Sequence, residues 1–263
     1  MTVLSLTTDF GLTNGFVGVM KGVIYGIAPD VKIVDISHLV SAQNVLEGAY
    51  ALWRAVPFFP PGSVHVGVID PGVGTVRRPI GARLGNQYFI APDNGLLTPL
   101  ILDAERNGKP MEFICLDNPK YWLSKISNTV HGRDIFAPTG AHLAAGVPLR
   151  ELGTSITDPV NLDMPRPEKT ENGWLAHVTI IDIFGNLTTD LPAEALEGQP
   201  DVLIRIREHE IDGIVESYGH RKVGALVALV DSEYHLEIAI VNGSAARTLG
   251  AQIGDEVEVI YRD

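Results

Sequence analysis

Residues 3–36 read VLSLTTDFGLTNGFVGVMKGVIYGIAPDVKIVDI, and this stretch decides the fold. Residues 3–7 form a short apolar and β-branched run of the kind found in strands. Apolar side chains then recur at three- and four-residue spacing from Phe16 to Ile27, which predicts a helix that stops before Pro29. Residues 31–36 form a second strand-like run. This order of strand, helix and strand is typical of a parallel sheet covered by helices.

The same alternation continues through the first two thirds of the chain. We expect a helix over residues 43–56, a strand over 64–69, another strand near 88–90 and a helix after Gly95. The pattern predicts an α/β domain over residues 1–167, with a central, mostly parallel sheet flanked by helices.

The periodicity disappears between residues 154 and 173, where Pro159, Pro165 and Pro167 stand among polar residues. This composition is typical of a connection between domains, so we place a boundary near residue 167. Beyond it come short runs rich in Val, Ile and Leu, at residues 175–183, 202–206, 226–230, 236–241 and 256–261. Turns containing Gly separate these runs, which predicts a smaller all-β barrel or sandwich over residues 168–263.

The charge balance excludes one class of partner. The chain has 263 residues, with 20 Lys+Arg against 32 Asp+Glu and a formal net charge of −12. An acidic surface repels phosphate backbones, and no cluster of basic residues longer than a pair offsets it. We therefore expect no nucleic-acid partner.

The single cysteine and the N-terminal residues indicate the cellular compartment. Cys115 has no partner for an intramolecular disulfide, which favours a reducing compartment. The N-terminal residues carry no basic region, and Asp9 interrupts them before an apolar stretch of secretory length develops. The apolar runs are far shorter than the ~20 residues of a membrane helix. We expect a cytoplasmic protein without membrane contact.

Polar residues follow several of the predicted strands. In an open α/β sheet, the carboxyl ends of the strands face a ligand crevice. The stretches in question are TTDFG at 7–11, DPGVGT at 70–75 followed by Arg77, APDNG at 91–95 and HGRD at 131–134. A carboxylate, a guanidinium and an imidazole could therefore meet at one edge of the sheet.

Each of these residues also has a purely structural interpretation. Asp9 and Asp70 precede turns that contain glycine and could cap their own backbone. Asp134 could be the N-cap of the following helix, and Arg77 beside Arg78 could be a solvated pair. Spacing alone leaves both interpretations open.

Several common site motifs are absent from the sequence. No phosphate-binding GxxxxGK[ST] run exists, and no GxGxxG turn follows the first strand. The histidines lack the close spacing of a zinc-binding helix, and no GxSxG nucleophile elbow occurs. We therefore expect no metal, no nucleoside triphosphatase and no α/β-hydrolase nucleophile.

Taken in order, the strand-end motifs resemble those of a known family. They are TTDFG at 7–11, VIDPGVGTVR at 68–77, APDNG at 91–95, HGRD at 131–134 and DIFGN at 182–186. The resemblance is to the adenosine-forming S-adenosyl-L-methionine (SAM) hydrolases, also called SAM hydroxide adenosyltransferases, which are relatives of the fluorinase and chlorinase. It runs from near residue 5 to about residue 257.

The resemblance implies an α/β N-terminal domain, a C-terminal β-barrel and a homotrimer with active sites between subunits. It also implies that water or hydroxide attacks C5′ of SAM and releases adenosine and L-methionine, with SAM as the substrate and no cofactor. The family's catalytic triad falls on Asp70, Arg77 and His131. The binding residues carried over are Asp9 for the ribose hydroxyls, Asp182 and Ser232 for the methionine group, and Phe184, Asn186 and the stretch around Asn242 for adenosine.

The chain departs from the family pattern at Val130, where relatives commonly carry an aromatic residue. Alternatives from other classes also stay open, namely a halide-using SAM adenosyltransferase, a non-catalytic SAM or adenosine sensor, and a purely structural trimer. Asp70 and His131 favour water over halide, because a fixed carboxylate beside a halide site opposes the anion. The intact triad speaks against the sensor.

Overall fold

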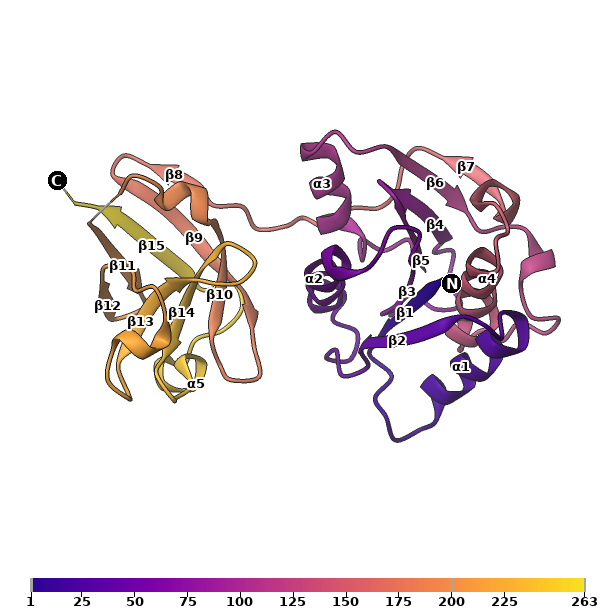
Figure 1. Ribbon diagram of the computed structural model, residues 1–263, viewed down its shortest axis with the longest axis horizontal. Coiled ribbons are helices and arrows are strands. Elements are labelled where there is room, and N and C mark those ends of the chain that lie inside the picture. Colours follow the sequence, from indigo (N-terminus) through magenta and orange to yellow (C-terminus); the bar gives the residue numbers. More distant parts are fainter. Residues whose placement is uncertain (1, 200, 263) are drawn as a thin grey trace. The chain divides into compact units, whose positions relative to one another are not determined.

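The chain folds into two compact units, Met1–Leu162 and Asp163–Asp263, in a computed structural model that describes residues 2–199 and 201–262 (Figure 1). The first unit is α/β and the second is almost entirely β. Within the described residues, no helix has the length and apolar character needed to cross a bilayer.

The N-terminal unit begins with the predicted strand, helix and strand, which are β1 (Val3–Thr8), α1 (Phe16–Ile27) and β2 (Lys32–Ser37). The other strands are β3 (Val64–Val68), β4 (Pro79–Leu84), β5 (Gln87–Pro92), β6 (Met111–Cys115) and β7 (Thr154–Ile156). The other helices are α2 (Val45–Ala55), α3 (Thr98–Arg106) and α4 (Ala137–Ala144). Short helical turns cover Val56–Phe58, Pro119–Tyr121, Gly132–Phe136 and Leu149–Leu152.

These strands form one mixed sheet in the order β2-β1-β3-β5-β4-β6-β7. The pairings from β2 to β5 are parallel, and those from β5 to β7 are antiparallel. Strand β4 was not predicted from the sequence, and the two-residue turn Gly85-Asn86 joins it to β5 as a hairpin. Gly85 has φ +62°, a conformation that glycine adopts without strain. The predicted parallel arrangement therefore holds for one half of the sheet only.

Helices cover both faces of this sheet (Figure 1). One core lies under α1 and α4 and includes Leu6, Met20 and Val66. The other lies under α2 and α3 and includes Leu52, Phe89 and Leu100. Residues on both faces of the central strands are buried, so the carboxyl ends of β1 and β3 are held by packing from two sides.

The C-terminal unit is an antiparallel, barrel-like sheet. Its strands run in the order β12-β11-β15-β9-β10-β14-β13, and β8 pairs with β9. The amide of Val215, which follows β12, donates to Ala228 O of β13 at 2.9 Å and brings the two ends of the sheet together. The elements are β8 (Glu168–Thr170), β9 (Gly173–Ile181), β10 (Leu187–Pro192), β11 (Val202–Ile206), β12 (His209–Asp212), β13 (Leu226–Val230), β14 (His235–Ile240), α5 (Ala245–Leu249) and β15 (Glu256–Tyr261), with short turns at Ala193–Leu196 and Tyr218–His220.

Candidate active site

Adjacent parallel strands bring Asp9 and Asp70 to the same edge of the N-terminal sheet. Thr8, the last residue of β1, lies opposite Val68, the last residue of β3. Asp9 and Asp70 follow these strand ends in the sequence. The topology therefore places both carboxylates where an open α/β sheet presents residues to a ligand.

Close backbone packing joins the motifs that carry these residues. A Cβ on Gly74, which has φ +74°, would lie 2.3 Å from Asn128 O, so only glycine fits between the loop after β3 and the segment before His131. A Cβ on Gly132 would lie 3.0 Å from the nearest atom of the Phe10 ring. The glycines thus allow the loops around Asp70, Asp9 and His131 to approach one another.

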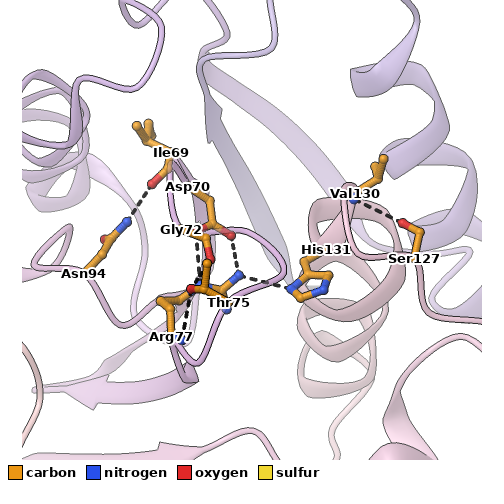
Figure 2. A network of polar contacts seen from close by, with 9 residues as sticks. All are labelled: Ile69, Asp70, Gly72, Thr75, Arg77, Asn94, Ser127, Val130 and His131. Carbon is orange, nitrogen blue, oxygen red and sulfur yellow. Dashed lines mark hydrogen bonds and ion pairs between the residues drawn. The ribbon is translucent and has the colours of Figure 1, made fainter.

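Arg77 joins Asp70 and His131 (Figure 2). Its Nε donates to Asp70 Oδ1 at 3.0 Å, and its Nη2 donates to Asp70 Oδ2. The same Nη2 lies 3.1 Å from His131 Nδ1. The side chains of Arg77 and Asp70 are only 7% and 5% exposed, and Arg77 Cζ lies 5.2 Å from the centre of the Phe136 ring. The residues that the resemblance assigned to a triad are therefore in direct contact.

Arg77 affects the protonation of both its neighbours, Asp70 and His131. A guanidinium nitrogen can only donate, so His131 Nδ1 accepts from Arg77, and neutral His131 carries its proton on Nε2. Burial lowers the pKa of His131, and the charge of Arg77 lowers it further. Burial raises the pKa of Asp70, although the ion pair with Arg77 opposes this shift. Asp70 can therefore accept a proton in this arrangement, whereas His131 presents a donor.

Neighbouring polar groups fix the backbone around the triad. Asn94 Nδ2 donates to Ile69 O at 2.8 Å and holds the peptide that precedes Asp70 (Figure 2). Thr75 Oγ1 donates to Gly72 O at 2.7 Å, which closes the loop between Asp70 and Arg77. Asn94 belongs to the APDNG motif at residues 91–95, so this motif supports the site rather than entering it through a carboxylate.

Asp134 lies inside the π-helical turn Gly132–Phe136 and is not an N-cap as the structural interpretation proposed. Its fully buried carboxylate accepts from Ser127 N at 2.7 Å and from Arg133 Nε at 2.5 Å. Burial acts to raise the pKa of Asp134, but the hydrogen bonds from Arg133 and Ser127 outweigh it and lower the pKa below its usual value. Asp134 therefore fixes the segment that carries His131.

Asp93 and Arg78 hold the connecting segment against the N-terminal unit. Arg78 Nε donates to Asp93 Oδ2 at 2.8 Å, and Arg78 Nη1 donates to Asp158 Oδ1 at 2.9 Å. Asp93 is 5% exposed, and its Oδ1 accepts from Val160 N at 2.8 Å. The pair Arg77-Arg78 is thus not a solvated pair, because each arginine binds its own carboxylate.

Asp9 is half-buried and keeps part of its carboxylate available. Its Oδ2 accepts from Gln43 N at 2.8 Å, whereas Oδ1 has no hydrogen-bond partner among the described residues. Gln43 has φ +66°, an uncommon conformation for a residue other than glycine. Asp9 therefore combines a fixed position with a free acceptor atom.

The remaining predicted binding residues lie in the C-terminal unit. Asp182 caps its own loop, because its Oδ1 accepts from Phe184 N at 2.9 Å and from Asn186 N at 2.8 Å. Its Oδ2 accepts from Asn186 Nδ2 at 3.1 Å. Phe184 is 72% exposed, so this loop presents an aromatic ring outward.

The loop at residues 182–186 packs against the stretch around Asn242. A Cβ on Gly185, which has φ +84°, would lie 2.0 Å from Ser244 Oγ. Ala246 N donates to Gly185 O at 2.9 Å. Asn242 has φ +54° and lies two residues before Ser244. The two segments that carry the predicted adenosine residues are therefore in contact.

Ser232 lies in the turn between β13 and β14, beside Asp231. Asp231 Oδ1 accepts from His235 N at 2.9 Å, and its Oδ2 accepts from Thr188 Oγ1 at 3.2 Å. Because Thr188 lies on β10, directly after the loop at residues 182–186, Asp231 ties the Ser232 turn to that loop.

This region also holds a buried carboxylate, Glu237, that was not predicted from the sequence. Tyr218 Oη donates to Glu237 Oε1 at 2.6 Å, and Glu237 is only 4% exposed. Burial, this hydrogen bond and the charges of Glu237, Asp182 and Asp231 raise the pKa of Tyr218. The available signal was an acidic residue inside the apolar run of β14.

No group of three or more His, Cys, Asp or Glu side chains in residues 2–199 and 201–262 is arranged to hold a metal ion. The acidic and imidazole groups of the triad are instead occupied by Arg77. The absence of a cofactor remains a prediction from the sequence.

Solved structures resemble this chain over nearly its full length. An uncharacterized conserved protein from Thermotoga maritima is 36% identical with a TM-score of 0.90, and covers 99% of this chain and 100% of its own. A conserved hypothetical protein from Thermus thermophilus is 32% identical with a TM-score of 0.79, over the same shares of the two chains.

Curated proteins and family models give the relationship a name. A protein from Salinispora tropica named (R)-S-adenosyl-L-methionine hydrolase is 38% identical over 97% of each chain. A protein of the same name from Methanocaldococcus jannaschii is 37% identical over 99% of this chain and 97% of its own, whereas a fluorinase from Actinoplanes is 32% identical over 74% and 73%. The N- and C-terminal domain models of the SAM hydroxide adenosyltransferases match residues 4–153 and 176–258. The chain belongs to the SAM hydroxide adenosyltransferase family.

Proposed function

We propose that this enzyme hydrolyses SAM to adenosine and L-methionine through attack of water on C5′ of the ribose. The observation that carries the proposal is the buried contact of Arg77 with both Asp70 and His131 at the carboxyl edge of the sheet. Support also comes from the near full-length relatives named SAM hydrolases, which are more similar to this chain than the fluorinase.

The chemistry requires a positioned water rather than a general acid. The sulfonium of SAM leaves as a neutral thioether, so the leaving group needs no proton. Holding one water in line with the C5′–S bond can lower the barrier by as much as ~7–11 kcal/mol in ideal cases. Positioning is therefore the main task of the site.

The protonation pattern of the triad suggests a role for each member. The proton released as the C5′–O bond forms goes to Asp70, whose pKa burial raises. Arg77 favours the developing hydroxide electrostatically, and one buried N–H of Arg77, at Nη1, has no hydrogen-bond partner among the described residues. His131 orients the water as a donor through Nε2, because Arg77 occupies Nδ1.

We assign substrate binding to the residues carried over from the family. Asp9 would accept hydrogen bonds from the ribose hydroxyls through its free oxygen. Asp182 and Ser232 would hold the amino-acid group of methionine. The exposed ring of Phe184, with Asn186 and Asn242, would contact adenosine. SAM is the substrate in this proposal, and no cofactor takes part.

The cellular setting is part of the same proposal. We expect a cytoplasmic homotrimer with active sites at the subunit interfaces, without nucleic-acid or membrane partners. The formal charge of −12 supports the absence of a nucleic-acid partner. Sedimentation of the purified protein, with and without adenosine, tests the trimer.

Product analysis tests the reaction. Purified protein is incubated with SAM, with and without chloride, and the products are separated by chromatography. Because the names of the relatives specify the (R) form, both sulfonium epimers are assayed. Changing the configuration at sulfur exchanges the methyl group and the methionine chain, which Asp182 and Ser232 would detect.

We expect adenosine and methionine in equal amounts, independent of chloride and strongly reduced in Asp70→Asn. A chlorinated nucleoside would assign the protein to the halide-using branch. Binding of adenosine without turnover of either epimer would support the sensor alternative and contradict hydrolysis.

A further inference from the structure

A chain of polar contacts runs from the surface of α1 to the end of β1. Lys21 Nζ donates to Asp35 Oδ2 at 2.6 Å, and His38 Nε2 lies 3.0 Å from Asp35 Oδ1. On the other side of the same ring, His38 Nδ1 lies 2.8 Å from Thr8 Oγ1. Thr8 is fully buried and His38 is 4% exposed, so water does not compete for their contact.

The hydroxyl of Thr8 contacts both the backbone of the following turn and the ring of His38. Thr8 Oγ1 accepts from Phe10 N at 3.3 Å and lies 2.8 Å from His38 Nδ1, so one side chain joins His38 to the start of the turn. His38 Nε2 is close to Asp35 Oδ1, at 3.0 Å, but lacks the alignment of a hydrogen bond.

The backbone brings His38 to this position through an irregularity in β2. Leu6 of β1 lies opposite Asp35, but Thr7 lies opposite Ser37, so Ile36 is an extra residue in β2. Such bulges redirect the side chains that follow them and are frequent beside active sites. The extra residue, Ile36, lies two residues before His38.

Two further hydrogen bonds connect the segment after β2 to the turn that carries Asp9. Gly11 N donates to His38 O at 2.8 Å. Gln43 N donates to Asp9 Oδ2, also at 2.8 Å. His38 therefore holds both ends of the turn at residues 8–11. Gln43 fixes the direction of the Asp9 carboxylate between them.

We propose that His38 is a positioning residue, which through Thr8 fixes the direction of the Asp9 carboxylate and so sets the preference for substrates with ribose hydroxyls over 2′-deoxy substrates. The inference rests on the role given to Asp9 in the proposed function. None of the described hydrogen bonds joins His38 to Asp70, Arg77 or His131, so the device acts on substrate recognition and not on the attacking water.

The neighbouring threonine provides a matched control. Thr7 and Thr8 are both fully buried on β1, but Thr7 Oγ1 has no hydrogen-bond partner among the described residues. Thr7→Val and Thr8→Val make the same change of shape and polarity, but only Thr8→Val breaks the contact with His38. Asp35→Asn weakens the other end of the chain at a partly exposed position and leaves the buried groups intact.

The test compares SAM with its 2′-deoxy analogue in these variants. In Thr8→Val we expect the ratio of kcat/KM for the two substrates to fall by ~tenfold, which corresponds to about 1.4 kcal/mol, through KM for SAM rather than kcat. Asp35→Asn is expected to shift the ratio in the same direction by a smaller factor. Thr7→Val is expected to keep the parent ratio and the parent kcat.

Unchanged discrimination in folded Thr8→Val and Asp35→Asn would overturn the inference, as would a loss of kcat without any change in the ratio. If Thr8→Val does not fold, the substrate ratios of Asp35→Asn and His38→Asn test the inference instead. In His38→Asn, the asparagine amide can still reach Thr8. If the parent protein does not hydrolyse SAM, the proposed function fails separately. Calorimetric affinities for adenosine and 2′-deoxyadenosine then test the positioning role in the same variants.

Discussion

The Asp70–Arg77–His131 site and the loop at residues 182–186 use carboxylates in opposite ways. Asp70 is buried and paired with a guanidinium, and its side chain is 5% exposed. Asp182 instead binds the backbone of its own loop, whose tip presents Ile183 and Phe184 at 95% and 72% exposure. The N-terminal unit therefore holds a buried, preorganised polar cluster, whereas the C-terminal loop presents apolar side chains at its surface.

The largest expected effect comes from disturbing the Asp70–Arg77–His131 site. Arg77→Lys keeps the charge but loses the two-point contact with Asp70 and the bond to His131. We expect SAM hydrolysis to fall by ~100-fold or more, as when a preorganised donor is removed from an active site. Circular dichroism checks the fold, and Arg83→Lys on the exposed side of β4 is the control. Parent-like turnover in Arg77→Lys would remove the cluster from the mechanism.

Acid is expected to lower the stability of the N-terminal unit through His65. His65 on β3 is fully buried beside Ser5 and Phe89, and burial lowers its pKa to about 4 from 6.5. The unfolded chain therefore binds more protons between these two values, and stability falls as the pH decreases through that window, by up to about 3 kcal/mol. Urea unfolding of the parent and of His65→Gln, followed at several pH values, measures this slope. An identical slope in both proteins would contradict the role of His65.

The pH profile of the reaction distinguishes Asp70 from His131 as the proton acceptor. Asp70 must be ionised to accept the proton, and burial raises its pKa. The rate is therefore expected to fall on the acid side at a higher pH than an ordinary aspartate would give, by ~tenfold per pH unit below that pKa. His131→Gln is expected to be slower but to keep this acid limb. Loss of the limb in His131→Gln would instead identify His131 as the base.

The smallest expected effect is in the loop at residues 182–186. Phe184→Ala removes an exposed ring, so the free energy of unfolding should be unchanged. If the ring contacts adenosine, KM for SAM should rise by ~tenfold, since base stacking on an aromatic side chain contributes about 1–3 kcal/mol. Val223→Ala, at a position that is 69% exposed in the same unit, is the control. Equal KM values in all three proteins would place adenosine elsewhere.

Local sequence patterns predicted the first elements of the N-terminal unit. The run at residues 3–7 and the helical spacing from Phe16 to Ile27 became β1 and α1. The hairpin of β4 and β5 was missed because its signal is only the pair Gly85-Asn86 within an α/β pattern. A short turn reverses the chain direction, which periodicity cannot report.

The contacts of the site were less accessible to sequence reasoning. The motifs supplied Asp70, Arg77 and His131, but their contact depends on the close approach of Gly74 to Asn128, between loops far apart in the chain. The role of Asp93 in holding the connecting segment was not predicted, because Val160 approaches it only in the folded unit. Long-range packing of this kind leaves no periodic signal.

Isotope labelling tests the central claim most directly. The protein is incubated with SAM in water enriched in oxygen-18, beside a sample without protein, and the products are analysed by mass spectrometry. Attack of water on C5′ places the label in the 5′-hydroxyl of adenosine and leaves methionine unlabelled. Adenosine without the label, or nucleoside products that carry no new oxygen, would contradict the account.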